Sequence, residues 1–425
     1  MEFALGDDSN KSEVAAAANY PQIRLFTVGQ CFYSPSPLPS LRSIEQGWVA
    51  ASPNSVARGG MFGVFSAVAW FFGRQVADAN PGVPIGLIAS TRGGSPISEW
   101  VAGEQKACGG KLTKQGHYFN TQIAPFAAGP TALSGFIWYQ AEADTKDEAS
   151  ARSYACTFPA LIQGWRAAFK RPEEQEEKFF GFVQLSTWCA TPPESLAQMR
   201  AAQMVALGLP RVGYSTNADH GAGCYIHPHN KRPCGTRLGN AALGLVYNRS
   251  TVHWKSPSYL SASTSGSTAG SALVVTVALA DAESLELRPA ANMHPDGANT
   301  TLTANGPNTT IDLAHCCPSA TATAACQCAW GAVEVAGQGW LNASISVKGG
   351  AILLTVKPKQ PAATASAATT TSTAAAASGG REEEVPVVLG SAYGWGAIPM
   401  LTVFESSTGL PVLPWNSSWN ATATS

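Results

Sequence analysis

The chain has 425 residues, 45% of them hydrophobic, which is enough to bury a sizeable core and to form two domains. Its 27 Lys and Arg residues nearly balance its 28 Asp and Glu residues, so no broad electrostatic field favours nucleic acid as a partner. No stretch approaches the roughly 18 unbroken apolar residues that a membrane span requires, which argues against membrane insertion.

The first 249 residues alternate apolar runs with amphipathic stretches, as α/β layer folds with a parallel sheet do. The pattern predicts helices at 64–76, 149–169, 193–207 and 229–247, and strands at 83–89, 133–139, 179–185 and 212–216. Each predicted strand ends in a polar or glycine-bearing segment. Open α/β sheets bind ligands at the carboxyl ends of their strands, so we expect the functional residues there.

Residues 250–425 have a different texture, in which segments rich in Ser, Thr and Gly enclose short alternating apolar runs. Runs at 272–278, 351–356 and 385–390 are typical of strands, and a β-sandwich is the predicted second domain. Within it, residues 361–380 are almost wholly Ala, Thr, Ser and Gly, which predicts a mobile surface insertion. An alanine-rich helix is the alternative, and the threonine run disfavours it.

Cysteines and glycosylation sequons point to an oxidising compartment. The chain has ten cysteines, and Asn-x-Ser/Thr triplets begin at Asn10, Asn248, Asn299, Asn308, Asn342, Asn416 and Asn420. We therefore predict a secreted protein, or one of an endomembrane or lysosome-like lumen. The first residues lack the basic and apolar segments of a signal peptide, so we expect the native protein to start upstream of Met1.

The first motif with chemical potential, at 90–100, directly follows a predicted buried strand. Its paired glycines, Gly93 and Gly94, allow backbone N–H groups to approach a reacting oxygen closely, as an oxyanion hole in acyl transfer requires. A plain tight turn is the alternative.

The second motif, at 138–144, follows the next predicted strand. The side-chain amide of Gln140 is a candidate donor to a developing oxyanion, and Glu142 is a candidate for ordering the loop or polarising a neighbour. A solvated acid beside a buried aromatic pair is the alternative.

The third motif, at 216–231, places histidines on a loop that leads into a helix. His227 with an acid upstream, Asp219, suggests the base and the orienting group of a hydrolytic triad. His220 and His229 also allow a metal site to be considered, but no recognised zinc-binding spacing accompanies them. We predict no metal or organic cofactor.

Together, in this order and at these strand ends, the three motifs resemble the sialate O-acetylesterase family of SGNH-type esterases. In that family a Ser-Ser-Trp-Gly-Gly-Thr-Pro-Ile segment, a Trp-Tyr-Gln-Gly-Glu segment and an Ile-His-Pro segment carry the oxyanion glycine, a second donor and the base. Gly93, Gly94, Gln140 and His227 fall on those places. The resemblance extends to segments at 84–88, 158–162, 393–395 and 409–411. It implies a three-layer SGNH-like parallel sheet.

The resemblance fails at the nucleophile. The family's serine lies in a Gly-Gln-Ser-Asn-Met-Glu block after the first strand, and only the tail of that block matches, at Met1 and Glu2. We therefore expect both the serine and the first strand to be missing from this chain. Ser9 is a weak substitute, because no apolar strand precedes it.

Other positions also depart from the family pattern. Ala141 replaces a glycine, Asp144 replaces an asparagine, and Arg92 stands where an aromatic residue is common. Cys224 occupies the place of the acid expected three residues before His227, and a Cys224–Cys234 disulfide is one hypothesis for that loop. The cysteines at 316, 317, 326 and 328 are read as disulfide partners rather than as a metal cluster.

The sequence therefore predicts a carboxylic ester hydrolase that removes O-acetyl groups from sialic acid or a related acetylated carbohydrate. The chain as given is expected to be inactive, or nearly so, without the serine. The alternative is a non-catalytic carbohydrate-binding protein that keeps the cleft. In either case the expected partner is an acetylated carbohydrate.

Overall fold

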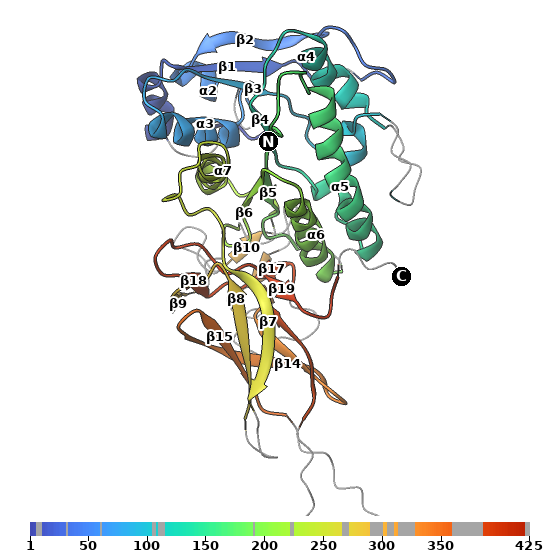
Figure 1. Ribbon diagram of the computed structural model, residues 1–425, viewed down its shortest axis with the longest axis vertical. Helices are drawn as coiled ribbons and strands as arrows, with labels where there is room; N and C mark the ends of the chain where they lie inside the picture. The colour runs from blue at the N-terminus through green and yellow to red at the C-terminus, as the bar shows by residue number, and fades with distance from the viewer. Residues whose placement is uncertain are drawn as a thin grey trace, which may run out of the picture.

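The computed structural model describes residues 1–5, 11–30, 33–59, 62–103, 108, 115–189, 192–221, 225–265, 272–289, 301–303, 310–312, 328–358 and 386–420. The molecule is elongated, with an α/β region at one end and an antiparallel β region at the other (Figure 1). The predicted succession of a mixed α/β part and a β part is confirmed. The predicted insertion at 361–380 and the candidate Ser9 lie outside the described residues.

The parallel strands of the α/β region form two separate sheets. The first has the order β2-β1-β3, in which β1 (Ile23–Val28) pairs antiparallel with β2 (Ile44–Ala50) and parallel with β3 (Ile85–Ala89). The second is parallel throughout, in the order β4-β5-β6, with β4 (Gly135–Trp138), β5 (Phe179–Gln184) and β6 (Val212–Thr216). The four predicted strands are confirmed, but they do not form the single continuous sheet that we expected.

Helices cover both sides of the strands (Figure 1). On one side α3 (Ala67–Ala79) packs against α7 (Arg232–Leu245), and on the other α5 (Glu148–Ala168) packs against α6 (Glu194–Met204). Capping residues fix two of their starts, because Ser66 accepts a hydrogen bond from the Ala69 N–H and Asp147 from that of Ser150. Three short helices, α1 (Lys11–Ala16), α2 (Pro53–Ala57) and α4 (Ala124–Ala128), complete this region.

The second region is built on a seven-stranded antiparallel sheet in the order β19-β16-β13-β14-β15-β8-β7. Its strands are β7 (Ser258–Ser265), β8 (Leu273–Ala280), β13 (Gly331–Val335), β14 (Gly339–Lys348), β15 (Ala351–Val356), β16 (Val388–Tyr393) and β19 (Trp415–Asn416). Smaller pairs are formed by β9 (Leu285–Leu287) with β18 (Val403–Glu405), β10 (Thr301–Thr303) with β11 (Thr310–Asp312), and β12 (Cys328–Ala329) with β17 (Ile398–Pro399). The inward side chains of the sheet form a second hydrophobic core, separate from that of the α/β region.

Some of the described cysteines form disulfides, as is typical of an oxidising compartment, and one is a free thiol. Cys108 and Cys156 form a disulfide, and Cys189 is also disulfide-bonded. Cys234 is buried and carries a free thiol, so the hypothesis of a Cys224–Cys234 bridge is wrong. Within the described ranges, no helix has both the length and the apolar character to cross a bilayer.

Candidate active site

A large cavity runs alongside β3 and β4 and continues past their carboxyl ends. It has a volume of about 1180 Å³, and Gly93, Gly94, Gln140, Glu142 and His227 all line it. The three motifs therefore meet at one site, although they are far apart in the sequence.

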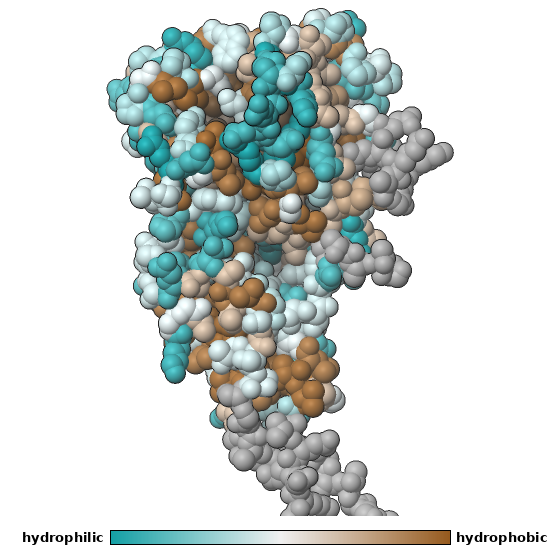
Figure 2. Space-filling view, in the orientation of Figure 1, coloured by the Kyte–Doolittle hydropathy of each residue, from teal (hydrophilic) through white to brown (hydrophobic). Residues whose placement is uncertain are grey.

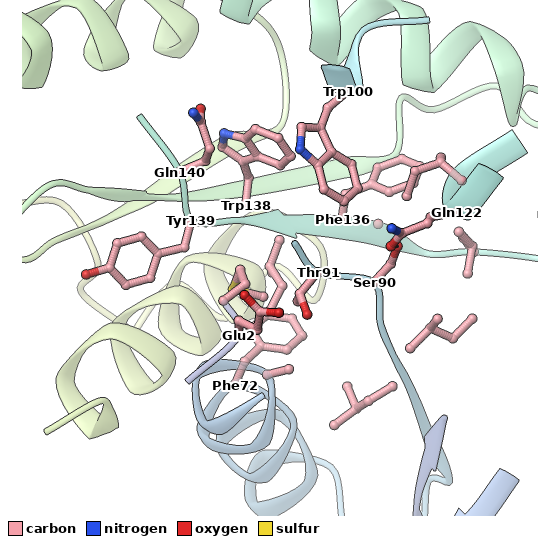
Figure 3. Close-up of a pocket in the computed structure, with 18 of the residues that line it drawn as sticks. Glu2, Phe72, Ser90, Thr91, Trp100, Gln122, Phe136, Trp138, Tyr139 and Gln140 are labelled. Atoms are coloured by element: carbon pink, nitrogen blue, oxygen red, sulfur yellow. The ribbon is translucent and has the colours of Figure 1, made fainter. Parts of the chain in front are cut away.

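The close-up shows how the two strands contribute (Figure 3). Ser90 and Thr91, from the segment after β3, lie near Glu2, while β4 ends at Trp138 and is followed by Tyr139 and Gln140. Tyr139 and Gln140, just beyond the end of β4, project in different directions. Only one of the two can therefore point into a given part of the cavity.

His227 has a carboxylate neighbour. Its Nδ1 lies 3.8 Å from Oε1 of Glu142, and both side chains are partly exposed. Burial lowers the pKa of His227, the Glu142 charge opposes this, and the nearby Lys231 adds to the lowering, so that the pKa falls below its usual range. The imidazole is therefore held mainly neutral near pH 7, which is the form that accepts a proton.

Asp219 lies in a different set of contacts. Its two carboxylate oxygens each accept a hydrogen bond from Arg237, at 2.8 Å, and Oδ2 lies 3.4 Å from Nε2 of His220. Burial raises the pKa of Asp219, but the Arg237 and His220 charges outweigh it and hold the pKa below its usual range. Asp219 is not one of the described residues that line the cavity. The carboxylate beside His227 is that of Glu142.

Gln140 lines the cavity, but its side-chain amide is already engaged. Nε2 donates to the Ser95 carbonyl at 3.1 Å and to Oδ2 of Asp144 at 2.6 Å, while Oε1 accepts from the Tyr154 hydroxyl at 3.1 Å. Both N–H groups of the amide therefore have acceptors in this conformation. To donate to an oxyanion, Gln140 would have to break one of these two hydrogen bonds.

A side chain would be unfavourable at Gly93 and at Gly94 for different reasons. Gly94 has φ of +71°, a conformation that favours glycine, and its missing side chain would point into open space. A methyl group at Gly93 would instead collide with the carboxylate of Glu2, which also accepts a hydrogen bond from Gln30. Among the described residues, neither glycine N–H has a hydrogen-bond acceptor. Both remain candidate oxyanion donors.

Sequence reasoning missed a buried cation in this site. The Lys231 side chain is buried, lines the cavity, and has its Nζ 4.6 Å from the ring centre of Phe3 and 5.2 Å from that of Tyr139. A signal was present, because Lys231 follows His227 by four residues in the motif. Within the described ranges, no group of three or more His, Cys, Asp or Glu side chains is arranged to hold a metal ion.

Comparison with known proteins agrees with these features. The family profile described as carbohydrate esterase, sialic acid-specific acetylesterase matches residues 38–242. Human sialate O-acetylesterase is 32% identical over 276 residues, which cover 58% of this chain and 51% of the human protein. Residues 38–242 thus resemble the sialate O-acetylesterase family. The predicted resemblance is thereby confirmed.

Two further similar proteins give the extent of the likeness. The rat sialate O-acetylesterase is 27% identical over 309 residues, covering 58% of this chain and 54% of the rat protein. A crystal structure of a carbohydrate acetylesterase from Xanthomonas citri matches with a TM-score of 0.70 at 25% identity, covering 99% of this chain and 78% of that one. The chain spans about half the length of the curated relatives it matches.

Proposed function

We propose that this chain forms the larger part of an esterase that removes O-acetyl groups from sialic acid or a related acetylated carbohydrate. The observation that carries the proposal is the meeting of Gly93, Gly94, Glu142 and His227 around one cavity at the carboxyl ends of β3 and β4. Acyl transfer needs a base and oxyanion donors on a common void, and these residue types supply both.

In the proposed reaction, a serine hydroxyl attacks the acetyl carbonyl while Nε2 of His227 takes its proton and later returns it to the leaving sugar oxygen. Glu142 holds the imidazole through Nδ1, a role that the sequence had suggested for Asp219. The backbone N–H groups of Gly93 and Gly94 receive the oxyanion, and the charge of Lys231 adds to their field. Water then cleaves the acetyl-enzyme with His227 again as base.

The scheme requires a serine nucleophile. Among the described residues, no serine hydroxyl is hydrogen-bonded to His227. The family pattern puts the nucleophile two residues before Met1, so we propose that the chain gains activity when that residue is supplied. The Cys108–Cys156 disulfide supports a secretory or lumenal location for the protein.

The test is to compare two extended chains, one with Gly-Gln-Ser-Asn and the other with Gly-Gln-Ala-Asn joined before Met1, each behind the same apolar strand. Release of acetate from O-acetylated sialic acid is expected from the serine form alone, and His227→Ala should reduce it by about 10³-fold or more. Hydrolysis that the unextended chain performs equally well, and that survives His227→Ala, would refute the mechanism.

A second candidate function is carbohydrate binding without chemistry, favoured by the engaged amide of Gln140. Saturation-transfer NMR with acetylated and de-acetylated sialic acid separates the two. Binding of the acetylated sugar without turnover in the serine-extended chain favours the binding protein, whereas turnover favours the esterase.

A further inference from the structure

A second, smaller cavity lies beside the glycine pair and has a volume of about 400 Å³. We call it the side pocket, and its lining includes Arg92, Gly93, Gly94, Glu99 and Tyr118. Residues 92–95 line both the side pocket and the large cavity, whereas His227 lines only the large cavity. The glycine pair therefore borders both spaces, and the proposed mechanism leaves the side pocket without a role.

The walls of the side pocket are held in place by buried contacts. The Ser95 hydroxyl donates to the Arg92 carbonyl at 2.7 Å and accepts from the indole N–H of Trp100 at 2.8 Å. The centre of the Trp100 ring lies 5.3 Å from that of the Tyr118 ring. Both Ser95 and Trp100 are buried. A pocket whose walls are fixed in this way needs little reorganisation to bind a ligand.

The side pocket has a cation and a carboxylate that are available to a ligand. Arg92 is exposed, and its guanidinium reaches Oε1 of Gln30 only at 3.5 Å, the outer limit of a hydrogen bond. Glu99 is half-buried. In the part of the chain that the structure describes, neither Arg92 nor Glu99 forms an ion pair. A ligand with groups of both kinds can therefore bind them without breaking a salt bridge.

These groups match the chemistry of a sugar that carries a carboxylate. A guanidinium binds a carboxylate through two parallel hydrogen bonds, and a carboxylate accepts hydrogen bonds from hydroxyl groups. The ring of Tyr118 offers an apolar surface to the C–H groups of a sugar ring. The volume lies at the lower end of the range for small-molecule pockets, which fits one sugar better than a chain of sugars.

The surface next to the glycine pair has the same mixed character. The N-terminus lies there, because Glu2 lies against Gly93. Around the N-terminus, hydrophilic and hydrophobic surface lie side by side at the centre of the view (Figure 2). A ligand that binds here meets polar and apolar groups together, as a sugar with polar hydroxyls and an apolar ring face requires.

We propose that the side pocket holds the sugar ring of the substrate, with Arg92 binding a carboxylate of that sugar and Glu99 accepting hydrogen bonds from its hydroxyl groups. An ester whose carbonyl oxygen lies at the glycine pair then has its carbonyl carbon on the His227 side and its sugar on the Arg92 side. Arg92 stands where an aromatic residue is common in the family, and its charge selects acidic over neutral sugars, which an aromatic ring would not do. The position of the ester rests on the proposed function, but the test does not require turnover.

The experiment measures the binding of de-O-acetylated sialic acid, and of its neutral carboxamide, to the full chain by NMR titration. Neither probe carries an O-acetyl ester, so hydrolysis does not enter. We expect the acid to bind about 10-fold more tightly than the amide, and Arg92→Met to remove this preference while changing amide binding little. Glu99→Gln should weaken amide binding about 3-fold or more, because a charged acceptor becomes a neutral one.

The matched controls are Arg249→Met and Glu173→Gln, at exposed positions that line neither cavity, and both should leave the two affinities unchanged. An acid preference that survives Arg92→Met would overturn the proposal. So would its loss in Lys231→Met alone, which would place the carboxylate in the large cavity, or the absence of binding by both probes. Binding as expected, without turnover in the serine-extended chain, would refute the proposed ester hydrolysis but support the side pocket as a sugar site.

Discussion

Nδ1 of His227 lies 3.8 Å from Oε1 of Glu142, whereas Asp219 is held by Arg237 through two hydrogen bonds of 2.8 Å. The acid nearest to the candidate base is therefore the one in the strand-end motif after β4. The contact between His227 and Glu142 links the loop after β4 to the loop before α7. Substituting Glu142 and Asp219 in turn can therefore distinguish their effects on His227.

The first prediction concerns the charge balance around His227. Glu142→Gln should lower the pKa of His227 further, because the carboxylate favours the imidazolium. Lys231→Met should raise the pKa of His227, because the ammonium disfavours the imidazolium. An NMR titration of the imidazole C–H signals measures both shifts without requiring activity.

The control for that titration is Glu45→Gln, at an exposed position of β2, which should leave the His227 titration unchanged. An unaltered pKa in Glu142→Gln would show that Glu142 does not interact with the imidazole. The orienting role would then have to be sought elsewhere.

The second prediction separates Asp219 from the base. Asp219→Asn should lower the free energy of unfolding by about 3 kcal/mol, because it leaves Arg237 buried without its charged partner. It should not change the His227 titration. Urea unfolding measures the first effect, and Glu286→Gln, which breaks the more exposed ion pair with Arg288, should cost no more than about 1 kcal/mol.

The pH dependence of stability follows from the same contacts. The pKa of Asp219 is lowered in the folded chain, so its contribution to stability is fully present above the unfolded value of about 4. The contribution is lost as the pH falls through the lower, folded value. Asp219→Asn should therefore show a smaller loss of stability on acidification; an unchanged acid limb would contradict the proposed ion-pair effect.

The sequence predicted most elements of the α/β region because their apolar runs are long and bounded by clear signals. Residues 212–216 form a strand with the predicted bounds, and α5 begins within one residue of its predicted start because Asp147 caps it. β2 was missed because only Gln46 of its residues is buried, so it shows no pattern of inward apolar residues.

The site was harder to predict than the strands. The motifs place Gly93, Gln140 and His227 at strand ends, and this is enough to bring them to one cavity. Which acid faces His227 depends on side-chain direction, and the buried pairing of Asp219 with Arg237 depends on how α7 packs on β6. Neither follows from spacing in the sequence. The engagement of the Gln140 amide by Asp144 likewise requires the folded loop.

The third prediction concerns the glycine pair. Gly94→Ala should lower the free energy of unfolding by about 1 kcal/mol, because φ of +71° is unfavourable for a residue with a Cβ even though the space around it is open. Gly208→Ala is the matched control, since its Cβ would also meet open space but its φ is not positive. Thermal unfolding of both variants measures the difference, and equal stability would contradict the role of the backbone conformation.

The fourth prediction concerns the contact between the α/β region and the antiparallel region. The buried guanidinium of Arg200 donates to the carbonyls of Leu185 at 3.0 Å, Ser186 at 3.2 Å, Gly396 at 2.9 Å and Ala397 at 2.8 Å. Because two of these carbonyls follow β5 and two precede β17, one side chain joins the two regions.

Arg200→Met keeps most of the apolar volume but leaves these four carbonyls without their donor. We expect it to lower the free energy of unfolding by about 2 to 4 kcal/mol, and to expose the segment around Ala397 to proteolysis. Arg171→Met is the control, since that guanidinium donates to an exposed Pro130 carbonyl, and it should cost less than about 1 kcal/mol. Equal costs for the two variants would mean that the regions are held together by their apolar contacts and not by Arg200.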